Sequence, residues 1–272
     1  MRTFWLAGLA LLVLHGANPA LAQQAAPGQQ AGPRPGYTDL ADLVLASPVI
    51  LHATVSRASR LGRRAAPDVP AGEVRVLVEA RLAALLRGDG LVPARAEWLW
   101  QGPTSAVPAR GTELIAFLAP AGEGPRPDVA QYRLTSVRGQ MPHDPALESR
   151  VRQILREAAG GVPRVRGVKA GFHVPGSIQG ESESQFFLDM ADGAPITLVV
   201  LRRPGAAPDV RVATGDLIDE SAAPIQRETL VWRTLACDLP SAPPASVAGD
   251  PGLAQDYAAI RAAVGECGRT QP

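Results

Sequence analysis

Short strand-like runs, separated by turns rich in proline and glycine, limit how this chain can fold more than any other feature. Val74, Val76 and Val78 recur with a period of two, which places their side chains on one face of a strand. Similar runs favour further strands in this part of the chain, at residues 49–55, 97–100, 114–118 and 132–137. Together they are enough for a small barrel or sandwich.

A helix is predicted to follow these strands. Asp144 suits the N-cap, Pro145 suits the first helical position, and Gly160 suits the position after the last turn. Between them, one face carries apolar residues at helical spacing, namely Leu147, Val151, Ile154, Leu155 and Ala158. We expect a first domain, residues 38–160, to end with this helix.

The remaining residues, 161–272, are predicted to form a second β-rich domain with a C-terminal helix. That helix should begin at Asp250-Pro251 and end at Gly265. Strands are expected before it, at residues 168–174, 185–190, 196–201, 210–213 and 229–236. The sequence therefore predicts a mainly β fold with a few helices (α+β), in which a barrel or small sandwich precedes a second β-sandwich-like module.

Residues 1–22 have the pattern of a cleavable signal peptide. Arg2 precedes an apolar run at residues 4–14, which is too short to cross a bilayer as a helix. Small residues end the segment, so cleavage is expected between Ala22 and Gln23. We therefore expect a periplasmic or secreted protein with no membrane span in its mature form.

The mature chain should begin with a disordered linker. Residues 23–37 are rich in glutamine, proline and glycine and show no apolar periodicity. Two cysteines follow later in the chain, Cys237 and Cys267, and in an oxidising compartment such a pair predicts one disulfide.

Charge argues against a nucleic-acid partner. The full chain has 27 basic and 26 acidic residues, and loss of Arg2 with the signal peptide leaves equal numbers of both signs. A chain without net charge has no overall attraction to phosphate backbones.

Three segments of the first half resemble the netrin-like modules, a family of OB-fold barrels that includes the tissue inhibitors of metalloproteinases. They are ADLVLASPVILHATVSRASRL at residues 41–61, VRVLVEARLAALLRG at residues 74–88, and GTELIAFLA at residues 111–119. The resemblance implies that the first domain is an OB-like barrel. The family's N-terminal cysteine, which chelates a protease's metal, is missing here, so the inhibitory mechanism does not carry over.

Trp98 and Trp100 are the candidate ligand face. Because they are two residues apart, a strand places both rings on one side, where they could stack on a sugar or a peptide. The alternative is that they fill the core, since other aromatic residues are scarce.

The mature chain has three histidines, His52, His143 and His173. None has a second ligand two or four residues away, and no HExxH motif is present. The sequence therefore predicts no metal site and no cofactor, and it predicts that no mature histidine is essential.

The segment from Gly180 to Ser184 nearly matches the GxSxG motif of serine hydrolases, with Ser182 at the nucleophile position. The final glycine is missing, and the segment leads into a predicted strand instead of a helix. We interpret it as a solvated acidic loop, and no catalytic residue is assigned.

These features favour an exported envelope or periplasmic protein that acts as a non-catalytic binding or interaction module. Its partner would be a protein or a glycan of the cell envelope. The alternative is an exported hydrolase whose catalytic residues come from distant loops. A cleft that gathers His173, Ser182 and one acid would favour this alternative.

Overall fold

The computed structural model describes residues 35–89, 93–122, 128–192, 194–215 and 222–270. The predicted signal peptide, its cleavage site and residues 23–34 lie outside this part of the chain. The linker prediction is wrong at its last residue, because Tyr37 is buried and begins helix α1 (Tyr37–Ala46).

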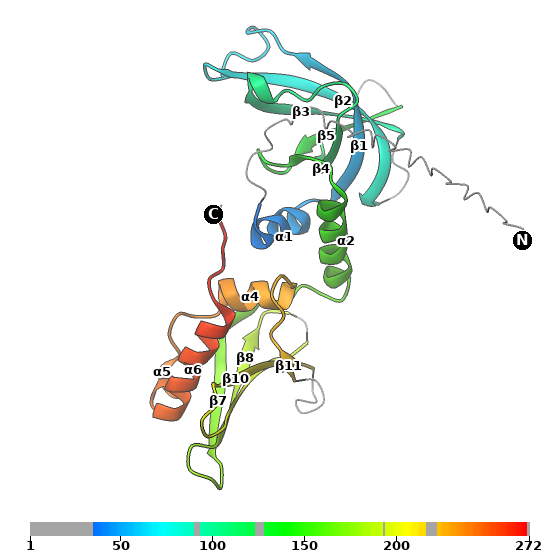
Figure 1. Ribbon diagram of the computed structural model, residues 1–272. Coiled ribbons are helices and arrows are strands. Elements are labelled where there is room, and N and C mark those ends of the chain that lie inside the picture. The colour runs from blue at the N-terminus through cyan, green and yellow to red at the C-terminus, as the bar shows by residue number, and fades with distance from the viewer. Residues whose placement is uncertain (1–34, 90–92, 123–127, 193, 216–221, 271–272) are drawn as a thin grey trace, which may run out of the picture. The chain divides into compact units, whose positions relative to one another are not determined.

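The first half is a closed five-stranded barrel (Figure 1). The strands follow the order β1-β2-β3-β5-β4, and pairing of β4 with β1 closes the ring. The pairs are antiparallel except for β3 with β5, which is parallel. The strands are β1 (Val49–Arg60), β2 (Glu73–Arg87), β3 (Arg95–Pro103), β4 (Glu113–Pro120) and β5 (Val129–Leu134), and the short β6 (Gln140–Pro142) pairs with β4.

Side chains along each strand point alternately into and out of the barrel, and the inward ones fill its interior. In β1, Leu51, Ala53 and Val55 belong to the inner hydrophobic cluster, whereas Ile50 lies in the cluster outside the barrel. The short turn η1 (Thr104–Ala106) follows β3. Closing the sheet in this way buries one face of each strand against the others.

Helix α2 (Pro145–Ala159) follows the barrel and begins as predicted. The side chain of Asp144 accepts hydrogen bonds from the backbone N–H groups of Ala146 and Leu147. Val151 and Ile154, on the predicted apolar face, are fully buried.

The second half is one antiparallel sheet of five strands in the order β11-β10-β9-β8-β7. Helices α4, α5 and α6 cover one of its faces (Figure 1). The strands are β7 (Val165–Pro175), β8 (Ser182–Met190), β9 (Ile196–Arg202), β10 (Asp209–Thr214) and β11 (Ala223–Pro224). The mainly β fold, a barrel followed by a second sheet, is thus confirmed.

The strand predicted at residues 229–236 is wrong, since this segment forms helix α4 (Leu230–Asp238). Thr229 caps it by accepting a hydrogen bond from the backbone N–H of Trp232. Two further helices follow, α5 (Ala245–Ala248) and α6 (Pro251–Val264). Helix α6 begins and ends where the sequence predicts, with the side chain of Asp250 bonded to Leu253 N.

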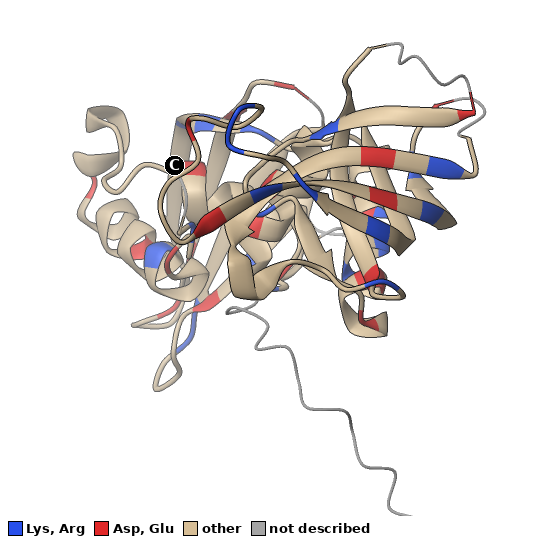
Figure 2. Ribbon diagram, turned by 90° about the horizontal axis from the view of Figure 1, so that it is seen from above, with Lys and Arg blue, Asp and Glu red and all other residues tan. Residues whose placement is uncertain are grey.

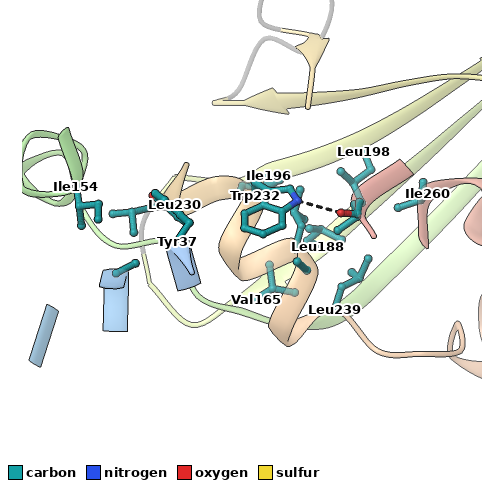
Figure 3. Packing of buried hydrophobic residues seen from close by; sticks show 14 of the residues in the cluster. Tyr37, Ile154, Val165, Leu188, Ile196, Leu198, Leu230, Trp232, Leu239 and Ile260 are labelled. Carbon is teal, nitrogen blue, oxygen red and sulfur yellow. Dashed lines mark hydrogen bonds between the residues drawn. The ribbon is translucent and has the colours of Figure 1, made fainter. Parts of the chain in front are cut away.

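One hydrophobic cluster joins the helices of both halves (Figure 3). It includes Tyr37 of α1, Ile154 of α2 and Trp232 of α4, and continues into the second sheet and α6. Residues 33–272 accordingly group as one compact unit. A domain boundary after residue 160 stays a prediction.

Candidate functional site

The two tryptophans of the predicted ligand face lie inside the barrel. Trp98 and Trp100 are 1% and 8% exposed and belong to the inner hydrophobic cluster. Nε1 of Trp98 donates to the amide oxygen of Gln140 at 2.7 Å, which satisfies its polar atom. The predicted ligand face is therefore wrong, because alternation in β3 points both rings into the interior of a closed sheet.

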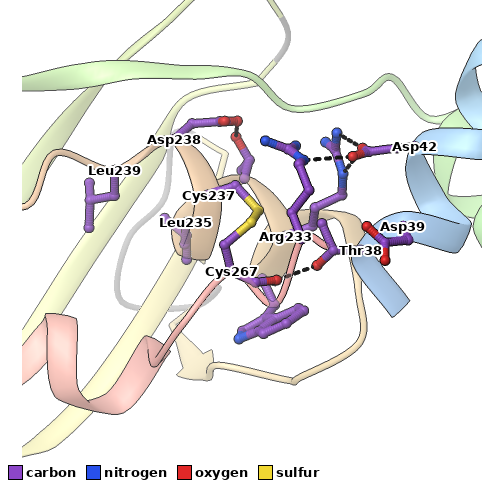
Figure 4. The surroundings of a disulfide bond; sticks show 12 residues. Thr38, Asp39, Asp42, Arg233, Leu235, Cys237, Asp238, Leu239 and Cys267 are labelled. Carbon is purple, nitrogen blue, oxygen red and sulfur yellow. Dashed lines mark hydrogen bonds and ion pairs between the residues drawn. A yellow bond between two sulfur atoms is a disulfide. The ribbon is translucent and has the colours of Figure 1, made fainter. Parts of the chain in front are cut away.

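Cys237 in α4 and Cys267 after α6 form the predicted disulfide (Figure 4). The carbonyl of Cys267 also accepts a hydrogen bond of 2.5 Å from the hydroxyl of Thr38 in α1. In addition, Asp42 of α1 forms an ion pair with Arg233 of α4. The disulfide thus lies at a joint where α1, α4 and the C-terminal segment meet.

His173 belongs to a buried polar network on the helix-covered face of the second sheet. Its Nδ1 lies 2.8 Å from Oγ of Ser184, and Ser184 donates to Asp256 at 2.5 Å. Arg202 donates to the other carboxylate oxygen of Asp256, also at 2.5 Å. Ser184 and Asp256 are fully buried.

This network does not have the order of a catalytic triad. In a serine hydrolase the histidine stands between serine and acid, whereas here Ser184 stands between His173 and Asp256. The network fastens α6, which carries Asp256, to β7, β8 and β9. Ser182, at the nucleophile position of the near-match to GxSxG, begins β8, so segment 180–184 does not form the strand-to-helix turn of a nucleophile elbow.

A groove of about 500 Å³ lies at the end of the second sheet where β7 turns into β8. Its apolar lining includes Phe172, Val174 and Leu201, which alternate with the residues that face the helices. Phe172 and Val174 are 61% and 62% exposed. The ring of Phe172 packs edge-on against Phe187, with centroids 5.8 Å apart, so its orientation is held.

The polar lining of this groove carries both signs of charge. Glu181 and Glu183 line it together with Arg202 and Arg203, and Arg202 is paired with Asp256. Over the described chain, basic and acidic residues are likewise interspersed (Figure 2). A groove of mixed charge does not favour a polyanion such as nucleic acid.

A second group of polar residues lies on the outer surface of the barrel. His52 of β1 and His143, which follows β6, stack with ring centroids 3.8 Å apart and planes 7° apart. Nδ1 of His52 and Nε2 of His143 lie 3.3 and 2.9 Å from the same carboxylate oxygen of Glu148 in α2. The opposite ring nitrogens face Glu113 of β4, at 3.8 Å from His52 Nε2 and 3.5 Å from His143 Nδ1.

Local structure positions each member of this group. Because Leu51 and Ala53 point into the barrel, His52 between them points outward. The backbone N–H of His143 donates to the carbonyl of Glu113 at 2.9 Å, which fixes the segment before α2 against β4. Arg152, one turn along α2, donates to Glu148 at 2.8 Å.

Arg152 favours the ionised form of Glu148. Its hydrogen bond lowers the pKa of Glu148, and the bond with His143 acts in the same direction, while burial acts in the opposite direction. The result is a carboxylate that offers an oxygen to both rings. His52, His143 and Glu148 could together hold a metal ion, since one donor atom of each lies within 4.8 Å of the others.

The structure brings together two histidines, His52 and His143, that local spacing gave no reason to pair. They are 91 positions apart in the printed sequence, and only barrel closure and the β4–β6 pairing bring them together. A weak local signal was present, because Glu148 lies in the first turn of the helix that Asp144 caps, close to His143. Nothing in the sequence pointed from this pair to His52.

No known protein family and no curated protein matches this sequence. Within the described residues, no helix has the length and apolar character needed to cross a membrane.

Proposed function

We propose that this is an exported, non-catalytic binding protein of the cell envelope that holds an extended polypeptide in the groove of its second sheet. One observation carries this proposal: the groove of about 500 Å³ is lined by the exposed apolar side chains of Phe172 and Val174 on a strand at the edge of the sheet. Exposed apolar surface with a polar rim is typical of protein interaction sites.

The position of β7 favours a polypeptide over a glycan. β7 is the terminal strand in the sheet order, and in the described part of the chain it pairs only with β8. An extended peptide can add to such an edge through its backbone while its side chains enter an adjoining pocket.

The His173 network gives no support to a serine hydrolase. Such an enzyme would need an accessible nucleophile next to the histidine, and Ser184, which contacts His173, is fully buried. The disulfide agrees with export, since such bonds persist in oxidising compartments.

A peptide-display selection on the mature protein tests the proposal. We expect enriched peptides with apolar side chains, and Val174→Arg should weaken their binding by about 10-fold or more, as for a central contact of an interface. Val137→Arg is the matched control, because Val137 is 83% exposed and lies outside the groove. The proposal would be overturned if Val174→Arg and Val137→Arg bound the selected peptides equally well. It would also be overturned if the protein bound a glycan array and selected no peptides.

Export is tested separately by the intact mass of protein recovered from cells. The expected mature chain begins at Gln23 and carries the Cys237–Cys267 bond. Recovery of a chain that begins at Met1 would contradict export.

A further inference from the structure

We propose that the outer surface of the barrel carries a binding site for a divalent transition metal ion, Zn²⁺ first, with His52, His143 and Glu148 as its ligands. This inference is independent of the peptide groove, which lies on the second sheet. Imidazole nitrogens with one carboxylate oxygen are a donor set that Zn²⁺ commonly takes in proteins.

The three donor atoms lie within 4.8 Å of one another, close enough for one ion to bridge them after small side-chain movements. Two ligands at about 2.0–2.1 Å from Zn²⁺ in a tetrahedral arrangement lie roughly 3.3 Å apart. The Glu148 oxygen lies 3.3 Å from His52 Nδ1 and 2.9 Å from His143 Nε2. Both rings direct a nitrogen toward the same carboxylate oxygen, but their planes are stacked only 7° apart. One ring would have to rotate out of the stack for both nitrogens to face a single ion.

The groups behind these donors are those that a metal site requires. A histidine ligand usually gives its second ring nitrogen to a carboxylate, which orients the ring. Glu113 lies on that side of both rings, at 3.8 Å from His52 Nε2 and 3.5 Å from His143 Nδ1, and a small movement would let it accept from either ring. Glu148 is oriented in the same way, because Arg152 holds its other oxygen at 2.8 Å.

One atom of the group has no partner in the described structure. Nε2 of His52 is buried and makes no hydrogen bond, although buried polar atoms are normally bonded. Metal binding at Nδ1 would fix the proton on Nε2 and strengthen its attraction to Glu113.

The site is accessible and lies at a structural junction. The side chains of the three ligands are 14–19% exposed, so an ion can enter without unfolding. Its ligands come from β1, from the segment after β6 and from the first turn of α2. A bound ion would tie α2 to the barrel wall and leave a fourth position for water.

The test is a titration of the untagged mature protein with Zn²⁺ after removal of metal by a chelator. Calorimetry should show one equivalent bound, and a Co²⁺-loaded sample should show the visible bands of tetrahedral coordination. His143→Gln and Glu148→Gln should each lower Zn²⁺ affinity by more than about 100-fold, and Glu113→Gln by about 10- to 100-fold, as is typical for an outer-shell carboxylate. His173→Gln is the matched control and should bind as the wild type does.

A measurement on the wild type keeps the test valid if a variant misfolds. Zn²⁺ should shift the ring proton resonances of His52 and His143 in NMR spectra and leave those of His173 in place. The proposal is overturned if the wild type binds no Zn²⁺, if His143→Gln retains full affinity, or if the His173 resonances shift instead. The group would then be a hydrogen-bond network of the barrel surface.

Discussion

The barrel and the second sheet bury their apolar faces by different means. In the barrel, the strands pack against one another, and pairing of β1 with β4 completes the ring. In the second sheet, the buried face packs on α4, α5 and α6, which lie later in the chain. The barrel core is therefore made by the sheet itself, whereas the core of the second half depends on keeping helices in place.

The attachments of those helices follow from this difference. The second half has a buried carboxylate network beneath α6 and a disulfide from α4 to the segment after α6. The hydrogen bond of Trp98 in the barrel, by comparison, lies within one continuous sheet. An open sheet covered by separate helices needs such attachments because the helices would otherwise gain conformational entropy by leaving.

Replacement of Asp256 by alanine should have the largest effect. Arg202 and Ser184 would lose a fully buried partner, and breaking a buried ion pair typically costs about 3–5 kcal/mol. We expect urea unfolding to show this loss and hydrogen exchange to place it in α6 and β7–β9. Asp209→Ala removes the half-exposed pair with Arg211 and should cost at most about 1 kcal/mol.

The comparison between the halves fails if Asp256→Ala is as mild as Asp209→Ala. It also fails if exchange rises equally in the barrel strands, because the two halves would then unfold as one.

Loss of the disulfide, by Cys237→Ser with Cys267→Ser, should cost about 3 kcal/mol, as expected for a loop of this size. Because the bond joins α4 to the segment after α6, we expect the final helix to loosen more than the first domain. The contacts of Thr38 with Cys267 and of Asp42 with Arg233 indicate that α1 loosens as well. Hydrogen exchange of α1 and α6, with β2 as the reference, decides between the two outcomes.

Local signals made part of the fold predictable. Asp144 and Asp250 each begin a helix because a side-chain oxygen before a proline satisfies free backbone donors, and this requires no tertiary information. Strand β2 was predictable from local sequence too, because Val74, Val76 and Val78 alternate with a period of two.

Packing decided the parts that were missed. The segment that forms α4 has apolar residues at helical spacing, namely Trp232, Leu235, Ala236 and Leu239. Neighbouring residues that favour strands led to the wrong prediction of a strand. Burial against the second sheet selects the helix instead. The scarcity of aromatic residues pointed to core filling by Trp98, and closure of the sheet is what places its ring in the interior. The meeting of His52 with His143 depends on that closure too, so the metal site is visible only in three dimensions.

Each half has a helix whose N-terminus is capped by an aspartate, so the same substitution can be compared in both. Asp144→Ala and Asp250→Ala should each cost about 1 kcal/mol. The loss at Asp144 should be the larger, since its carboxylate accepts from two backbone N–H groups and that of Asp250 from one. Urea unfolding measures both. Serine at either position should restore most of the loss, and failure to do so would mean that charge, and not capping, stabilises these helices.

The smallest effect concerns a buried phenol in each half. Burial raises the pKa of Tyr257 in α6 above its ordinary value of 10.0, although the positive charge of Arg261 acts in the opposite direction. Burial also raises the pKa of Tyr132 in β5 of the barrel. A raised folded pKa means that the stability linked to each phenol is fully present below pH 10 and is lost as the pH rises through the folded pKa.

Tyr257→Phe should therefore cost about 1 kcal/mol at neutral pH, because the phenol donates a hydrogen bond of 2.6 Å to the carbonyl of Pro240. Above pH 10 the gap to the wild type should narrow, since the variant no longer carries a group that favours the unfolded state when ionised. Tyr132→Phe should likewise gain stability relative to the wild type above pH 10. Because Tyr132 lies in β5, this gain does not involve α6. Urea unfolding at a series of pH values measures the free energy of unfolding of both variants. If the difference between wild type and Tyr257→Phe stays constant into the alkaline range, α6 leaves the sheet before the phenol ionises.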